Sequence, residues 1–401
     1  MLLSFALIFI VGMLLSSLCK KVGLPGLIGM ILTGILIGPY CLNWIDESVL
    51  NISSQLRKIA LIIILLRAGI SLDVSDLKKV GRPAILLCFV PACFEIIGML
   101  VLGPKLLGIS LSDSFVMGCV VAAVSPAVIV PKMLQLMSEK YGTDKSIPQM
   151  ILAGASVDDV FVIVLFSMSL SLAQGQAVNL INLLSIPISI LAGILIGALC
   201  GKLISVYFKK ISLDTTIQTI VLLSVSFILV TIEDSFSFPF SGLIAVMTMG
   251  VFVQRITQSS HTLNELWTGA QVLLFVLVGA CVNISSALNY GFSAILLVFG
   301  VLLFRMIGVL ICLLNTKLNR KERLFCMIAY CPKATVQAAI GGVALSMGLA
   351  CGEIVLTVVV LSILITAPLG SFLIEHTYKN LLTKKRIRLN PYSFHRLLLV
   401  L

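Results

Sequence analysis

Apolar segments of roughly 20 residues, the length that crosses the hydrocarbon core of a bilayer as a helix, follow one another from residue 2 to residue 374. Only short polar breaks separate them. Of the 401 residues, 59% are hydrophobic and 11% are charged, and the mean hydropathy is +1.15. No stretch remains for a soluble domain, so the chain is predicted to be an all-α polytopic membrane protein.

The hydropathy pattern predicts about 13 transmembrane helices. The N-terminal segment has no basic residue before it and no small-residue cleavage site, so we expect a retained helix there and not a signal peptide. The expected helices cover residues 2–19, 24–42, 55–72, 83–103, 112–133, 147–172, 179–208, 214–232, 237–254, 266–284, 291–314, 323–348 and 354–374.

The basic residues are distributed unevenly between the two sides of this topology. Of the 28 Lys and Arg residues, 22 lie after odd-numbered helices or in the tail, and 3 lie after even-numbered helices. Because Lys and Arg collect on the cytoplasmic side, we expect the N-terminus outside the cell and the C-terminus in the cytoplasm, in an inner or plasma membrane. Topology therefore explains the net charge of +11, and no nucleic-acid partner is expected. The basic tail, residues 377–401, is expected to lie on the membrane surface, with a partner site as the alternative.

Glycine and proline motifs recur between the two halves of the chain. Gly26 opens a Gly-Leu-Ile motif followed by Gly34, and Gly242 opens the same motif followed by Gly250. Matching helices are an odd number of crossings apart, which predicts two inverted six-helix repeats; chance similarity between Gly-rich helices is the alternative. The expected units are residues 1–174 (first repeat, helices 1–6), 175–211 (linker helix 7), 212–376 (second repeat, helices 8–13) and 377–401 (tail).

Pro126 and Pro332 lie in the middle of expected helices 5 and 12, at matching places of the two repeats. A proline removes a backbone donor, and the carbonyls that it frees are tolerated only where protein or a watery cavity satisfies them. We therefore predict two discontinuous helices, whose ends can bind a small ion. A simple proline kink is the alternative.

Asp158 and Asp159 lie midway along expected helix 6, with apolar residues on both sides. A charge at the bilayer centre costs roughly 2.5–3.5 kcal/mol on insertion scales, so such residues are usually functional. Two adjacent carboxylates in a poorly solvated place resist joint ionisation, and we expect one of them to bind and release a proton near physiological pH. A water-filled vestibule with two ordinary acids is the alternative.

Four further charges fall inside the expected helices. Lys333 follows the proline of helix 12, and we predict that its ammonium reaches Asp158 or the carbonyl ends of the half-helices; a lysine that only neutralises helix ends is the alternative. Glu95 and Arg305 occupy equivalent positions of the two repeats and are predicted to form a structural ion pair, with a proton role for Glu95 as the alternative. Arg67 is close enough to Asp73 to snorkel towards the helix end and is assigned no role.

Several motifs resemble those of the monovalent cation/proton antiporter superfamily, and most closely its NHA-type sodium/proton exchangers. The resemblance runs from about expected helix 2 to helix 13. Its motifs are RAGISLD at 67–73, AVSPAVIVP at 123–131, the paired aspartates at 158–159 and CPKATVQAAIG at 331–341.

This resemblance implies a fold and a site. It implies a homodimer whose helices 5 and 12 are broken and cross beside the aspartates. Asp159 is implied as the principal ion carboxylate and Asp158 as the partner of Lys333, so that both aspartates contact Na⁺ or Li⁺, with Ser125 and Thr335 near the ion. The implied interface domain covers about residues 1–77 and 212–288, and the mobile core covers about residues 82–174 and 290–376.

The expected function is secondary active antiport of Na⁺ or Li⁺ against H⁺ by an elevator-type mechanism, in which cation and proton compete for the aspartate pair. No catalysis and no cofactor besides the transported ions are expected. The alternatives are a sodium-coupled organic-anion symporter of the same architecture and a K⁺/H⁺ antiporter. An intramembrane aspartyl protease is disfavoured because no GxGD motif occurs. A channel is disfavoured because obligatory exchange requires a barrier.

Overall fold

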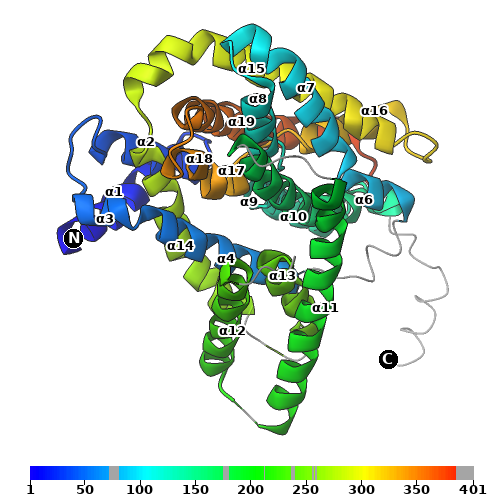
Figure 1. Ribbon diagram of the computed structural model, residues 1–401. Helices are drawn as coiled ribbons and strands as arrows, with labels where there is room; N and C mark the ends of the chain where they lie inside the picture. Colours follow the sequence, from blue (N-terminus) through cyan, green and yellow to red (C-terminus); the bar gives the residue numbers. More distant parts are fainter. Residues whose placement is uncertain are drawn as a thin grey trace, which may run out of the picture.

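The computed structural model describes residues 1–71, 81–174, 180–211, 213–235, 240–254, 257 and 260–384. Within these ranges the chain is helical, apart from loops and one isolated bridge between Tyr141 and Lys384 (Figure 1). A 3-10 helix covers Thr143–Lys145. The α-helices are α1 (Leu2–Lys21), α2 (Gly26–Ile37), α3 (Glu47–Asn51), α4 (Ser53–Ser71), α6 (Arg82–Leu87), α7 (Val90–Leu107), α8 (Leu111–Val121), α9 (Pro126–Glu139), α10 (Ile147–Ala173), α11 (Leu180–Lys210), α12 (Thr215–Ser235), α13 (Gly242–Val253), α14 (Ser260–Ala280), α15 (Ile284–Cys312), α16 (Arg320–Ala329), α17 (Thr335–Ile340), α18 (Val343–Ser346) and α19 (Gly352–Leu381).

Eight helical stretches in the described residues are long and apolar enough to cross a membrane, namely α1, α6 with α7, α10, α11, α12, α14, α15 and α19. Four shorter apolar stretches are α2, α8, α13 and the α17–α18 pair. The chain is therefore a multi-pass membrane protein. The two glycine motifs lie in the shorter helices α2 and α13, whereas Pro126 begins α9 and Pro332 lies between α16 and α17.

Three expected helices differ from the continuous segments that hydropathy predicts, and one of them, helix 5, is divided into α8 and α9 before Pro126. Helix 4 is divided into α6 and α7, because Pro91 at the start of α7 has no N–H to bond the preceding turn. Helix 12 is divided twice, beside Pro332 and again at Gly341–Gly342 between α17 and α18. Hydropathy alone does not register these interruptions, because every piece remains apolar.

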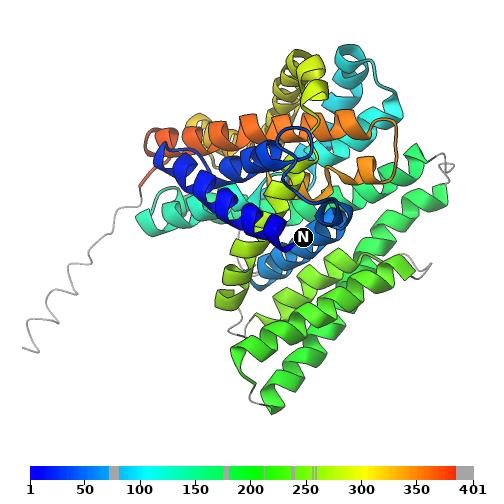
Figure 2. The same cartoon turned by 90° about the vertical axis from the view of Figure 1, so that its left-hand side faces the viewer.

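The helices pack in two groups on either side of α17. One group comprises α1, α2, α4 and α11 to α14, and the other comprises α6 to α10, α15, α16 and α19. Both views place α11 and α12 at one side of the molecule and α7 and α15 at the opposite side (Figures 1 and 2). The short helix α17 contacts α4 and α14 of the first group and α8, α10 and α19 of the second.

Two close helix crossings in the first group depend on glycine. A Cβ atom on Gly34 of α2 would lie 1.9 Å from the carbonyl oxygen of Val276 on α14, and one on Gly279 of α14 would lie 2.2 Å from that of Ile31. At the crossing of α4 and α13, a Cβ atom on Gly69 would lie 2.1 Å from the carbonyl oxygen of Met247. Only glycine permits such backbone approach, as in other membrane helix pairs.

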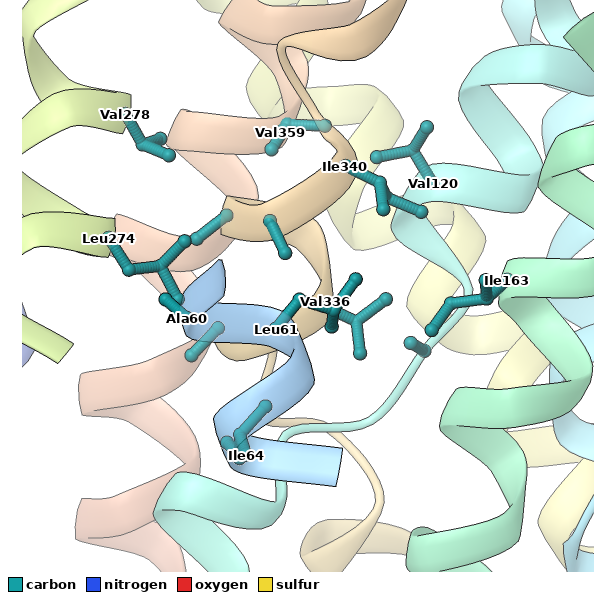
Figure 3. Close-up of a cluster of buried hydrophobic side chains, with 14 of the residues drawn as sticks. Ala60, Leu61, Ile64, Val120, Ile163, Leu274, Val278, Val336, Ile340 and Val359 are labelled. Carbon is teal, nitrogen blue, oxygen red and sulfur yellow. The ribbon is translucent and has the colours of Figure 1, made fainter. Parts of the chain in front are cut away.

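Apolar side chains surround α17 on both sides (Figure 3). Val336 and Ile340 of α17 are 1% and 5% exposed, so this layer is closed to water. The neighbours drawn around them are Ala60, Leu61 and Ile64 of α4, Val120 of α8, Ile163 of α10, Leu274 and Val278 of α14, and Val359 of α19. The contact between the two helix groups is thus apolar along this face of α17, and the buried guanidinium of Arg57 on α4 lies next to it at Gly342.

Candidate ion-binding site

Two interrupted helices meet at the centre of the second group. The chain leaves helical geometry between the end of α8 at Val121 and the start of α9 at Pro126, and again between α16 and α17 around Pro332. The backbone N–H of Ser125 donates to the carbonyl oxygen of Pro332 at 2.8 Å, so the two interruptions touch. Proline at the first position of α9 suits a helix start, where its missing N–H leaves no bond unmade.

Asp158 and Asp159 lie on α10 beside this contact, with 0% and 5% of their surface exposed. Oδ2 of Asp158 accepts a hydrogen bond from the backbone N–H of Val124 at 3.0 Å. The same oxygen accepts one from Nη2 of Arg305 at 2.9 Å. One carboxylate of the pair is therefore anchored both to the broken helix and to an arginine.

Arg305 on α15 connects most of the site. Its Nη1 donates to Oε2 of Glu95 at 2.8 Å, so the predicted Glu95 and Arg305 side chains do lie together. Its Nη1 also donates to the carbonyl oxygen of Ala122, and its Nε donates to that of Tyr330 at 2.7 Å. Sequence reasoning assigned Arg305 to Glu95 alone and missed its bond to Asp158. A planar guanidinium has five N–H donors and can bond several acceptors at once. This chemistry is the signal in the sequence that Arg305 could have more than one partner.

Lys333 has a different partner from the one predicted for it. Its Nζ donates to Oε2 of Glu95 at 2.5 Å, and the prediction that it holds Asp158 is wrong. Oδ2 of Asp158 accepts from Arg305 and from the Val124 N–H, so this carboxylate already has a basic partner without Lys333. Glu95 therefore belongs to the charged site. It does not form a separate structural pair with Arg305 alone.

Gln337 on α17 joins the two interruptions and was not predicted as a site residue. Its Nε2 donates to the carbonyl oxygens of Val121, at 3.1 Å, and Ala123, which the end of α8 leaves free. Its Oε1 accepts from the N–H of Ala334 at 2.9 Å. The signal in the sequence is an amide side chain inside an apolar segment, two residues after Thr335.

The charges of the cluster do not cancel when every group is ionised. Glu95, Asp158 and Asp159 supply three negative charges, whereas Arg305 and Lys333 supply two positive charges, and all five side chains are 5% exposed or less. An uncompensated buried charge is costly in a medium of low polarity. One further positive charge, carried by a proton or a metal ion, would neutralise the cluster.

Besides Oε1 of Glu95 and Oη of Tyr330, four buried oxygen atoms at the site have no hydrogen-bond partner within the described part of the chain. They are Oγ of Ser125, Oγ1 of Thr335, Oδ1 of Asp158 and Oδ1 of Asp159. Hydroxyl and carboxylate oxygens are the ligands that hard cations prefer. The chemistry of this donor set fits a small monovalent cation.

Arg67 lies on α4, half-buried and apart from the bonds described above, and its predicted partner Asp73 lies outside the described residues.

Comparison with known proteins places the chain in a family. The family model described as sodium/hydrogen exchanger, transmembrane, matches residues 5–379. The chain belongs to the sodium/hydrogen exchanger family. The resemblance to the cation/proton antiporter superfamily that the motifs indicate is thereby confirmed.

Relatives in this exchanger family are similar along most of the chain. Sodium/hydrogen exchanger 9B2 of Homo sapiens is 35% identical over 380 residues, which cover 90% of this chain and 70% of the human protein. Sodium/hydrogen exchanger 9B1 of Homo sapiens is 31% identical over 382 residues, which cover 90% and 73%. The sodium proton antiporter MjNhaP1 from Methanocaldococcus jannaschii has a similar structure, with a TM-score of 0.83, 22% sequence identity, and coverage of 94% of this chain and 97% of that one. At this identity the structural match shows a shared fold.

Proposed function

We propose that the protein exchanges Na⁺ or Li⁺ for H⁺ across the cell membrane. The observation that carries the proposal is the set of four buried oxygens without a partner in the described residues, next to a cluster with one excess negative charge. Membership of the sodium/hydrogen exchanger family supports the same activity. The names of the 9B2 and 9B1 relatives point to it as well.

Competition for one site produces the exchange. Asp159, whose carboxylate has no bond to Arg305 or Lys333 among those that the described residues make, is the exchanging carboxylate. It holds either a proton or a dehydrated cation, because each removes the negative charge that attracts the other. Asp158, Ser125 and Thr335 supply further oxygens to the cation. Only the neutralised cluster crosses the apolar layer at low cost, so loading one ion releases the other and leakage is suppressed.

The movement is an elevator-like slide of a core domain against an interface domain. The two helix groups support this division, with the interface domain at about residues 1–77 and 212–288 and the core at about 82–174 and 290–376. The apolar contact of α17 with both groups suits sliding, because dispersion contacts re-form at a new register whereas buried ion pairs do not. All five charged side chains of the site lie within the core.

Two inverted repeats and about 13 crossings are part of this proposal. Gly34 of α2 faces Gly279 of α14, and Gly250 of α13 faces Gly69 of α4, so each repeat contributes one glycine to each crossing. Two crossings with this reciprocal pairing of glycines are what a pseudo-twofold axis between the repeats generates. The N-terminus lies outside, the C-terminus lies in the cytoplasm, and the protein forms a homodimer. Organic-anion symport is disfavoured, because the buried excess charge is negative.

Proteoliposomes with an imposed pH gradient provide the test. Na⁺ or Li⁺ added to the outside is expected to collapse the gradient in vesicles with the parent protein, and not in vesicles with Asp159→Asn. K⁺ serves as the comparison that separates Na⁺/H⁺ from K⁺/H⁺ exchange. An unchanged gradient with the parent protein, or full activity in Asp159→Asn, would show that the assignment is wrong.

A further inference from the structure

Tyr330 lies between α16 and α17 and is held from two sides. Its ring lies under the guanidinium of Arg305, with 5.6 Å between Cζ and the ring centroid, and its carbonyl oxygen accepts from Nε of the same arginine at 2.7 Å. Its hydroxyl lies against α10 at Gly154, where a Cβ atom would be 2.0 Å from the hydroxyl oxygen. Any side chain at position 154 would therefore collide with the Tyr330 hydroxyl.

The Tyr330 hydroxyl is fully buried and has no hydrogen-bond partner among the described residues. The same is true of Oδ1 of Asp158, although Oδ2 of that carboxylate has two donors. Buried polar atoms in folded proteins almost always bond to protein or to ordered water. A single shared water molecule would satisfy both atoms.

Helix geometry brings the two oxygens within the reach of one water molecule. Gly154 and Asp158 are four residues apart on α10, so they lie on one face with roughly 6 Å between their Cβ positions. Side chains on a helix lean towards its N-terminus, which turns Asp158 towards Gly154 and the hydroxyl above it. A water molecule that bonds two oxygens spans roughly 5.5 Å, a length close to this separation.

We propose that a water molecule is bound between Oη of Tyr330 and Oδ1 of Asp158, and that Tyr330 is a positioning residue for this carboxylate. The tyrosine hydroxyl donates to the water, and the water donates to Oδ1. Arg305 and the Val124 N–H fix the other oxygen, so the water fixes Oδ1 and sets the orientation of the carboxylate, while a second lone pair of Oδ1 stays available to the cation. The role in exchange rests on the proposed function, whereas the water site itself does not.

Thermal unfolding of the detergent-purified full chain tests the water site. The decisive observation is whether Tyr330→Phe lowers or raises the Tm. Tyr330→Phe retains the ring and its contact with Arg305 but removes the hydroxyl. If the hydroxyl bonds a water, its removal lowers the Tm; if it is truly unpaired, its removal raises the Tm. Tyr378→Phe is the matched control, because the Tyr378 hydroxyl donates to Oε2 of Glu139 at 2.8 Å. We expect both variants to lower the Tm, and an unchanged or raised Tm for Tyr330→Phe overturns the proposal.

A second measurement asks whether Asp158 shares the water. In an Asp158→Ala background, Tyr330→Phe is expected to change the Tm by less than half as much as in the parent chain, because neighbours with a shared partner are not additive. An undiminished shift overturns the bridge. In proteoliposomes, Tyr330→Phe is expected to raise the half-saturating Na⁺ concentration roughly fivefold, the equivalent of one hydrogen bond, with the maximal rate within about twofold.

The transport arm separates the two proposals. If the parent chain exchanges Na⁺ for H⁺ but Tyr330→Phe has an unchanged half-saturating concentration, the positioning role is wrong and the proposed function stands. If the parent chain shows no exchange, the proposed function fails, while the two unfolding measurements still decide whether the water is bound.

Discussion

Nζ of Lys333 lies 2.5 Å from Oε2 of Glu95, so a residue of the broken helix is paired with α7. Glu95 also accepts from Arg305 through the same oxygen, which makes one carboxylate the counter-ion of two cations. The pairing leaves Asp159 without a basic partner among the described contacts. The structure thus separates the charges that hold the core together from the carboxylate that is proposed to exchange ions.

Glu95→Gln is expected to destabilise the protein strongly. It leaves Arg305 and Lys333 buried with one carboxylate fewer, and breaking a buried pair from one side costs roughly 3–5 kcal/mol. Thermal unfolding in detergent measures the effect as a fall in Tm. Glu47→Gln at the exposed start of α3 is the control and is expected to change the Tm little. Equal shifts for the two variants would contradict the assigned role of Glu95.

A charge swap is expected not to rescue this loss. Glu95→Arg combined with Arg305→Glu restores one pair but places the new arginine beside Lys333 and the new glutamate beside Asp158. Like charges in a buried site repel, so the double variant should remain less stable than the parent protein. Adding Lys333→Met removes the repulsion between the two cations and should recover part of the Tm. A double variant as stable as the parent would show that Lys333 is not a partner of Glu95.

The sequence predicts which residues form this site better than it predicts their partners. A charge or a proline inside an apolar segment is costly wherever the fold places it, so Asp158, Lys333 and Pro126 are recognisable from the sequence alone. Pairing depends on distances that hydropathy does not contain. With acids and bases from four helices converging, Lys333 could have reached Asp158, and the position of Arg305 decides otherwise.

The fold shows the same division between local and tertiary information. The helical segments follow from apolar length, and the Gly26 and Gly242 motifs are visible by their spacing. The mutual contact of Gly34 with Gly279 is not visible in this way, because it depends on how α2 crosses α14. The interruption before α7 could have been predicted from the sequence, because Pro91 is a local signal for a helix start.

Removing single hydroxyls at the candidate cation site should weaken Na⁺ binding without unfolding the protein. Ser125→Ala and Thr335→Ala each delete an oxygen that has no partner in the described chain, so stability should not fall. The half-saturating Na⁺ concentration should rise roughly fivefold, which corresponds to about 1 kcal/mol. Ser169→Ala is the control, since its hydroxyl donates to the carbonyl oxygen of Phe166 at 2.7 Å. Unaltered Na⁺ dependence in both site variants would remove these hydroxyls from the site.

Alanine substitution at two glycines of one helix should have opposite effects. Gly279→Ala on α14 places a methyl group 2.2 Å from the carbonyl oxygen of Ile31, so α2 and α14 must separate. Gly269→Ala on the same helix meets no atom within 4 Å. It should stabilise the chain by about 0.4–1 kcal/mol, because alanine restricts the unfolded state. Thermal unfolding should therefore give a lower Tm for the first variant and an equal or higher one for the second. A harmless Gly279→Ala would contradict the close crossing.

An ion pair between the exposed Lys145 and the buried Glu322 should couple the loop before α10 to α16, the first part of broken helix 12. Nζ of Lys145, in the loop before α10, donates to Oε2 of Glu322 at 2.7 Å, and the Glu322 side chain is completely buried. Glu322 also closes a capping box with Asn319 at the N-terminus of α16. Lys145→Met leaves this carboxylate buried without its cation, so the Tm should fall by more than for Lys321→Met, which removes an exposed cation from the adjacent position.

The same pair predicts a difference between losing one partner and losing both. Lys145→Met combined with Glu322→Gln removes the unpaired charge and retains an amide that can still accept from the N–H of Asn319. The double variant should therefore be more stable than Lys145→Met alone, because the cost lies in the isolated buried charge and not in the missing attraction. If the second substitution lowers the Tm further by its own full amount, the two residues act independently, and the coupling of the loop before α10 to α16 is disproved.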